Sequence, residues 1–90
     1  MRFEVRGGFI VFHDDKPASY VTLQGPRGNM VFRNDASSFS DARRTYAWAF
    51  ETTDLSDGDQ VVFCSHEREV VGEVQGGQIV VVPASQKKVV

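Results

Sequence analysis

Apolar and polar residues alternate along the first third of the chain, the pattern of strands with one buried face. Residues 2–6 place apolar side chains on one side and charged ones on the other. A glycine pair at residues 7–8 separates them from the apolar run 9–13, and two glycines can adopt the positive φ of a tight hairpin turn. The segments 20–24 and 30–33 continue the pattern after turn-like residues. We therefore expect a four-stranded meander in this part of the chain.

The hydrophobic period changes in the middle of the chain. Ser38 can cap a helix, and apolar side chains then recur at helical spacing. We expect one α-helix over about residues 39–51, because alanine favours helices over strands. The alternative is a strand, on which Tyr46, Trp48 and Phe50 share one face and are buried together. The helical stripe consists of Phe39, Ala42, Tyr46, Ala49 and Phe50.

The last third returns to the strand pattern. Segments 60–65, 67–74 and 78–83 are rich in β-branched residues, and two glycines within residues 75–77 indicate a hairpin between the last pair. Residues 79–82 are apolar on both faces, which predicts cover on two sides by the core or by a second copy in a homodimer. Residues 84–90 are expected to form a loosely held C-terminal tail.

These elements predict one small α+β domain over residues 1–90. The architecture we expect is a strongly twisted antiparallel sheet, or a partly open small barrel, of about six to seven strands. One α-helix, at about residues 39–51, is expected to pack on that sheet.

Composition narrows the function classes. The chain of 90 residues is 41% hydrophobic and 24% charged, which excludes an intrinsically disordered protein. Its 10 basic and 12 acidic residues give a net charge of −2, which argues against a strongly basic polyanion binder. The single cysteine, Cys64, rules out an intrachain disulfide and favours a reducing compartment. With no secretory signal pattern and no apolar run near ~18 residues, we expect a cytoplasmic protein without membrane association.

Few residues point to catalysis or metal binding. Cys64, His66 and Glu67 lie close in sequence, and His13 is a conceivable fourth ligand. Zinc sites usually combine two closely spaced ligand pairs, and the chain has one. No glycine-rich turn or helix start follows Cys64 to activate it as a nucleophile. We therefore expect no metal, no cofactor and no enzymatic activity.

The candidate contact surface centres on Trp48. On the expected helix this indole lies opposite the apolar stripe, with Arg44 and Glu51 one turn away. Tryptophan and arginine are enriched among residues that dominate binding energy. Arg27, at the tip of a glycine-rich loop, adds a long donor for a carboxylate or phosphate. Two alternatives bury the indole: cover by the tail or a neighbouring loop, and the strand described above.

The sequence thus predicts a non-catalytic interaction module whose partner is another protein or protein complex. By size class alone, it is similar to small phage or mobile-element proteins that inhibit host complexes. A small β-rich nucleic-acid-binding domain is the second hypothesis, with Arg43-Arg44 and the Arg27/Arg33 hairpin flanking a strand surface. A structural component of a particle is the third.

Overall fold

The computed structural model describes residues 1–26, 31–52 and 54–87. Within this part the protein is nearly all β, with 54% strand and no helix of seven or more residues. The elements are β1 (Arg2–Arg6), β2 (Phe9–Asp14), β3 (Thr22–Gln24), β4 (Val31–Arg33), β5 (Ser38–Ser40), β6 (Thr45–Glu51), β7 (Gln60–Cys64), β8 (Glu69–Gln75), β9 (Gln78–Val82) and the short 3₁₀ turn η2 (Ala84–Gln86).

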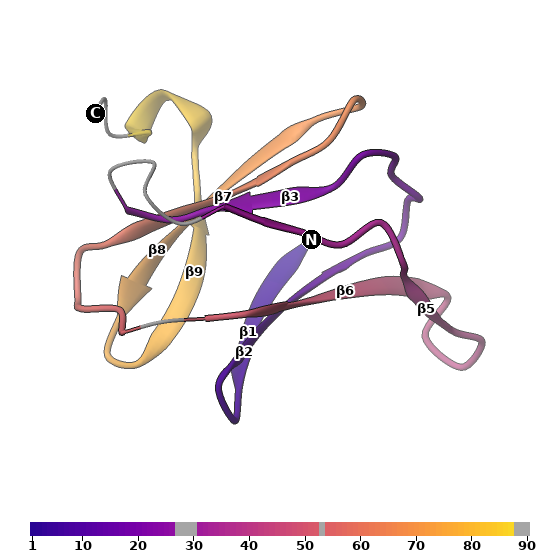
Figure 1. Cartoon of the computed structure of the whole chain (residues 1–90), viewed down its shortest axis with the longest axis horizontal. Helices are drawn as coiled ribbons and strands as arrows, with labels where there is room; N and C mark the ends of the chain where they lie inside the picture. Colours follow the sequence, from indigo (N-terminus) through magenta and orange to yellow (C-terminus); the bar gives the residue numbers. More distant parts are fainter. Residues whose placement is uncertain (27–30, 53, 88–90) are drawn as a thin grey trace.

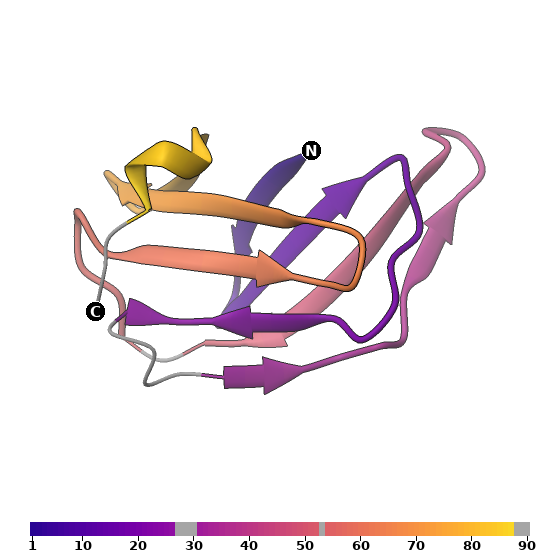
Figure 2. The same cartoon turned by 90° about the horizontal axis from the view of Figure 1, so that it is seen from above.

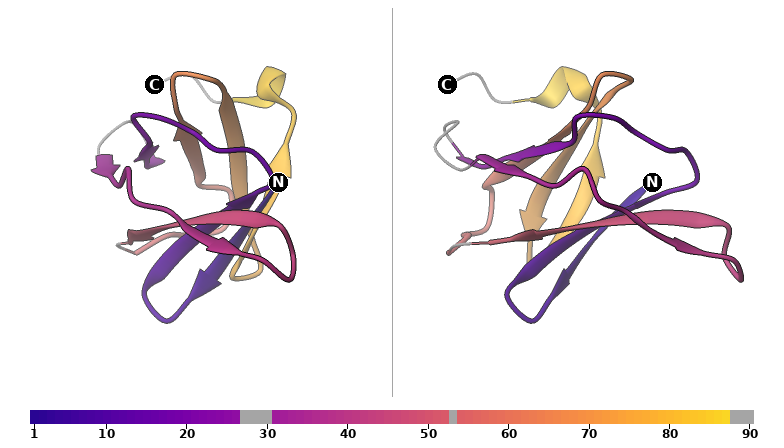
Figure 3. Two further views of the ribbon diagram at one scale, coloured as in Figure 1. Left: turned by 90° about the vertical axis from the view of Figure 1, so that its right-hand side faces the viewer. Right: turned by 45° about the vertical axis from the view of Figure 1, so that its right-hand side comes forward.

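The strands form two antiparallel sheets. Sheet A has the strand order β1-β2-β6-β5, and sheet B has the order β4-β3-β7-β8-β9. Sheet A occupies the lower part of the view in Figure 1, and Figure 2 shows its strands running obliquely to those of sheet B. The two layers approach each other where β1 lies against β9 (Figure 3). Their facing side chains fill the space between them, as in packed β-sheets generally.

Aromatic side chains from both sheets meet in the core. Phe63 of β7 stacks on Phe12 of β2 with 4.0 Å between ring centroids, and it lies 5.3 Å from Trp48 of β6. Large buried rings contribute much of the apolar area that drives folding. The core cluster consists of Phe3, Ile10, Phe12, Val21, Leu23, Trp48, Phe50, Val61, Phe63, Val70, Val74 and Ile79.

The α-helix expected over residues 39–51 is wrong, and with it the α+β class. This segment forms β5, a turn and β6 instead. Aromatic residues alternate with alanine along β6, so the strand turns Tyr46, Trp48 and Phe50 towards the core. Burying such rings is worth a few kcal/mol each, whereas alanine's helix preference amounts to less than about 1 kcal/mol per residue. Tertiary packing therefore overrides local propensity here.

The expected four-stranded meander is also wrong. The hairpins β1–β2 and β3–β4 belong to different sheets, because β2 pairs with β6 and β3 pairs with β7. The linker between the hairpins contains Pro17, which cannot donate to a ladder. It carries the chain from sheet A to sheet B. Alternation along a strand identifies its buried face, but it does not specify which distant strand becomes its neighbour.

The two glycine hairpins are confirmed. Gly7 and Gly8 have φ values of 51° and 86° between β1 and β2. Gly76 and Gly77 have φ values of 61° and 79° between β8 and β9. Both pairs occupy the left-handed region that tight two-residue turns require and that residues with a Cβ avoid.

The C-terminal segment packs across sheet B as far as residue 87. The Gln60 side-chain amide donates to the Gln86 carbonyl at 2.9 Å, and Lys87 pairs with Glu69 at 3.3 Å. Residues 88–90 of the expected tail lie outside the described residues. The cover expected on both faces of residues 79–82 is incomplete within one chain, since Val80 remains 38% exposed. The homodimer stays a prediction.

Gly72 of β8 has no room for a side chain, because Ile79 of β9 and Phe3 of β1 pack against it. A Cβ added here would lie 2.5 Å from Ile79 Cγ2 and 2.8 Å from Phe3 Cε2. We expect Gly72→Ala to lower the free energy of unfolding by about 1–3 kcal/mol, because overpacking forces neighbouring side chains from their preferred positions. Urea denaturation followed by circular dichroism measures the change.

The matched control for this substitution is the double variant Gly72→Ala/Phe3→Leu. The smaller side chain at position 3 makes room for the added methyl group. The double variant should therefore lose less free energy of unfolding than the sum of the losses in the two single variants. A Gly72→Ala protein as stable as the wild type would contradict the close approach of β1 and β8.

Candidate functional site

Trp48 lies in the core and not on the surface. Its side chain is 1% exposed, so the expectation of an indole projecting into solvent is wrong. Its Nε1 is buried and has no hydrogen-bond partner within the described part of the chain. The indole packs against the stacked rings of Phe12 and Phe63, with ring centroids 6.2 and 5.3 Å away. This burial removes Trp48 from the surface on which a partner could dock.

The other predicted contact residues are not brought together. Arg44 lies in the turn between β5 and β6, whereas Glu51 ends β6 opposite Phe9. The length of β6 separates them by roughly 20 Å at the usual rise of a strand. Arg27 lies outside the described residues. The predicted surface around Trp48 is therefore not a single site.

The candidate metal ligands are engaged in other contacts. Among the described residues, no group of three His, Cys, Asp or Glu side chains could hold a metal ion. His13 Nε2 lies 2.9 Å from Glu4 Oε1 on sheet A. His66 stacks on Tyr20 with 4.3 Å between ring centroids. Glu67 accepts a hydrogen bond from the Ser19 backbone N–H at 3.0 Å.

Cys64 is a half-buried thiol at the end of β7. Burial raises the pKa of this thiol above its ordinary value, and the carboxylate of Glu69 raises it further. A raised pKa keeps the sulfur protonated and weakens it as a nucleophile. The microenvironment therefore lacks the features that activate a cysteine for attack.

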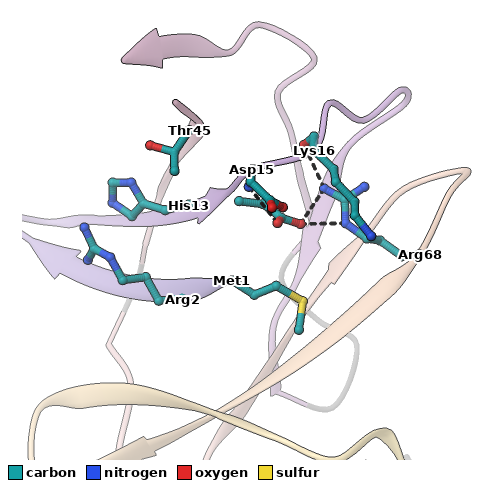
Figure 4. Close-up of a pocket in the computed structure, with 8 residues that line it drawn as sticks. Met1, Arg2, His13, Asp15, Lys16, Thr45 and Arg68 are labelled. Carbon is teal, nitrogen blue, oxygen red and sulfur yellow. Dashed lines mark hydrogen bonds and ion pairs between the residues drawn. The ribbon is translucent and has the colours of Figure 1, made fainter. Parts of the chain in front are cut away.

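A buried ion pair joins the two sheets beside a hollow (Figure 4). Asp14 at the end of β2 is 3% exposed, and its Oδ2 lies 2.7 Å from Nη2 and 2.8 Å from Nε of Arg68. The same guanidinium donates to the carbonyls of Lys16 and Pro17, both at 3.0 Å. Arg68 thus holds the β2–β3 linker against the loop that precedes β8.

The Asp14 carboxylate is held in its charged form. Burial by itself raises the pKa of this group, but the hydrogen bond from the Asp15 backbone and the charge of Arg68 outweigh burial, so the pKa lies below its ordinary value. The adjoining hollow, of about 470 Å³, mixes acidic and basic side chains. Arg68 already donates to Asp14 and to the carbonyls of Lys16 and Pro17, so its contacts in this hollow serve to hold the two sheets together.

A second hollow, of about 360 Å³, crosses the outer face of sheet A. We call it the basic groove. Its floor is made by small side chains on the outward face of β2 and β6, and its walls carry cationic and hydroxyl groups. The residues that line it are Arg6, Val11, His13, Ser38, Phe39, Ser40, Arg43, Thr45, Ala47 and Ala49.

The ionisable side chains that line the basic groove are Arg6, Arg43 and His13, and among the described residues no carboxylate lines it. The Glu4 carboxylate is on the same face of sheet A, next to Val11, and offsets part of the positive charge. Glu4 lies beside it and bonds to Arg6 Nη2 at 2.9 Å and to His13 at 2.9 Å. The hydrogen bonds from His13 and Arg6 lower the pKa of Glu4, which therefore stays ionised near neutral pH. The Phe39 ring lies on the other face of sheet A, beside Tyr46 with 4.8 Å between ring centroids, and is 48% exposed.

Sequence reasoning missed the basic groove because it treated residues 39–51 as a helix. The alternation along β6 contains the signal. If aromatic residues face the core, then Ala47 and Ala49 must face outward and leave a shallow floor beside the larger side chains of neighbouring strands. That β1 and the β5–β6 turn border the same floor depends on strand order, which the local pattern does not contain.

Comparisons with known protein families, with curated proteins and with solved structures return no match. Across the described residues, no helix has the length and apolar character needed to cross a membrane. The geometry and charge of the basic groove are therefore the basis for assigning a function.

Proposed function

We propose that the protein is a non-catalytic interaction module that binds an acidic partner protein through the basic groove. The observation that supports this is the absence of carboxylates from the lining of the groove, which holds two arginines and a histidine. Acidic residues outnumber basic ones in the whole chain, so a groove that two arginines line, with Glu4 at its border, is a local departure from that composition. Complementary charge guides encounter and selects among partners.

The floor of the groove favours a protein partner over single-stranded nucleic acid. Single-strand binders present aromatic rings on which successive bases stack. Here the floor consists of Val11, Ala47 and Ala49, which offer no such platform. The Phe39 ring lies beside Tyr46 on the opposite face of sheet A. The net charge of −2 also provides little long-range attraction for a polyanion.

Three narrower predictions accompany this proposal, and each rests on a single observation. A reducing compartment such as the cytoplasm fits a chain with one cysteine. Inhibition of a host complex by a phage protein rests on size class alone. A homodimer is favoured by the exposed valines Val80 and Val81 on the edge strand β9.

A pull-down from cells of the source organism tests the proposal. We expect wild-type protein to retain a specific partner, and Arg43→Gln to lose most of it, because Arg43 lines the groove. The control is Arg33→Gln, which removes the same charge from an exposed arginine on sheet B. Thermal denaturation verifies that both variants are folded. The identity and pI of the retained protein are determined by mass spectrometry.

Two outcomes would contradict the proposal. The groove would not be the binding surface if Arg33→Gln reduced retention as much as Arg43→Gln. The nucleic-acid hypothesis would replace it if nuclease treatment of the lysate abolished the retention, or if the retained species were RNA or DNA.

A further inference from the structure

We infer that the partner segment recognised by the basic groove is an extended acidic peptide with carboxylates about four residues apart. The inference rests on the proposed function and adds the shape and spacing of the ligand. It depends on three features of the groove: where its two arginines lie, how small its floor is, and which groups border the floor.

The two arginines enter the groove from opposite corners of sheet A. Arg6 ends β1, an edge strand, and Arg43 lies in the turn that follows β5, the other edge strand. Strand spacing and strand rise place the two backbones roughly 25 Å apart along a diagonal of the sheet. Each guanidinium lies about five bonds of roughly 1.5 Å from its Cα. Because both side chains line the hollow between them, the charged groups are separated by roughly 15 Å.

This separation matches an extended chain better than a helix. Four residues of extended chain span about 13 Å and leave both end side chains on one face, whereas four residues of helix span about 6 Å. A helix is also about 10 Å wide with its side chains, too bulky to rest on a shallow floor between the two arginines. An extended segment can therefore place one carboxylate on each guanidinium while it lies across the sheet.

The floor permits close approach of a peptide backbone. Val11, Ala47 and Ala49 are small, so a strand-like segment can settle between the larger walls. The hydroxyl groups of Ser38 and Thr45 border the same floor and can donate to or accept from peptide groups of the ligand. Between its two acids, the ligand is expected to carry small or hydroxyl side chains.

The arginines retain donors for the ligand. Arg6 uses Nη2 to bind Glu4 at 2.9 Å, and a guanidinium has five N–H donors. Its side chain is 71% exposed. Glu4 lowers the positive charge at this end of the groove and orients Arg6. Removing the Glu4 charge should therefore strengthen the attraction for an acidic peptide.

Fluorescence anisotropy with the full chain and labelled synthetic peptides tests this inference. Each peptide carries two glutamates in a serine and alanine background, separated by one, three, five or seven residues, which keeps both glutamates on one face of an extended chain. We expect the tightest binding with three intervening residues, and weaker binding as the salt concentration rises. A peptide with glutamine at both positions should lose at least tenfold in affinity.

Variants of the protein show which arginine binds each of the two carboxylates of the peptide. Arg6→Gln and Arg43→Gln should each weaken the best peptide about fivefold, the effect of an exposed ion pair worth about 1 kcal/mol. Arg33→Gln, outside the groove, should change the affinity less than twofold. Glu4→Gln should tighten binding about twofold. In either arginine variant the dependence on glutamate spacing should disappear, because one end of the ligand has lost its partner.

The results separate this inference from the proposed function. Equal affinity for all spacings, or no binding of any peptide, would overturn the extended two-ended ligand, whereas an Arg43-dependent partner in the pull-down would still support an acidic protein partner. A single-stranded oligonucleotide that binds more tightly than the peptides, with the same dependence on Arg6 and Arg43, would overturn the choice of a peptide.

Discussion

Replacing Trp48 with alanine is expected to lower the free energy of unfolding by about 3–5 kcal/mol. The side chain is 1% exposed and lies among rings from both sheets, so its removal leaves a cavity at the centre of the core. Domains of this size are stable by about 5–15 kcal/mol, so the loss is a large fraction of the total. Urea denaturation followed by far-ultraviolet circular dichroism measures it, since the substitution removes the only tryptophan.

Two control variants show whether the cost comes from burial. Trp48→Phe keeps an aromatic ring and also removes the unpartnered buried Nε1, so it should cost clearly less than Trp48→Ala. Phe39→Ala truncates a ring that is 48% exposed and should cost less than about 1 kcal/mol. A Trp48→Ala protein with wild-type stability would show that the indole is outside the core.

Replacing Arg68 with methionine is expected to destabilise the fold by about 3–5 kcal/mol near neutral pH, because it leaves the buried Asp14 carboxylate without its cation. It also removes the hydrogen bonds to the carbonyls of Lys16 and Pro17. The double variant Asp14→Asn/Arg68→Met should lose less stability than the sum of the two single variants, because only the double variant leaves no unpaired charge. If the losses of stability in the two single variants simply added in the double variant, a direct interaction between Asp14 and Arg68 would be contradicted.

The pH dependence of this variant has a definite sign. In the wild type the pKa of Asp14 lies below its unfolded value, so its contribution is fully present above that unfolded value and is lost as the pH falls through the folded pKa. Without Arg68, two of the interactions that lower this pKa are lost, so the pKa of the Asp14 carboxyl is higher in the variant than in the wild type. The difference in stability between wild type and Arg68→Met should therefore shrink as the pH falls. Denaturation series at neutral and acidic pH measure this difference.

Local patterns in the sequence predict much of the fold. The alternation of residues 2–6 and the glycine pairs at both hairpins correctly predict β1, β2, β8 and β9, because these elements depend on near neighbours. The segment 39–51 fits a helical period and a strand period equally well. The choice between them depends on Phe12 and Phe63, which are distant in sequence and bury Trp48.

The functional surface was less predictable for the same reason. The Asp14–Arg68 pair joins residues 54 positions apart, and no local signal connects them. The basic groove combines β1, β2, β5 and β6, whose adjacency follows from the pairing of β2 with β6. Once that pairing is known, the outward position of Ala47 and the cationic walls follow from alternation alone.

The pairing of β2 with β6 also constrains how the chain folds as it emerges from the ribosome. Until residues 45–51 have been synthesised, the β1–β2 hairpin has no neighbour to cover Ile10 and Phe12. Sheet A therefore forms late, after a long loop has closed, and such topologies fold in milliseconds to seconds. A nascent chain paused before Thr45 presents an uncovered apolar ribbon, the kind of surface that chaperones bind during translation.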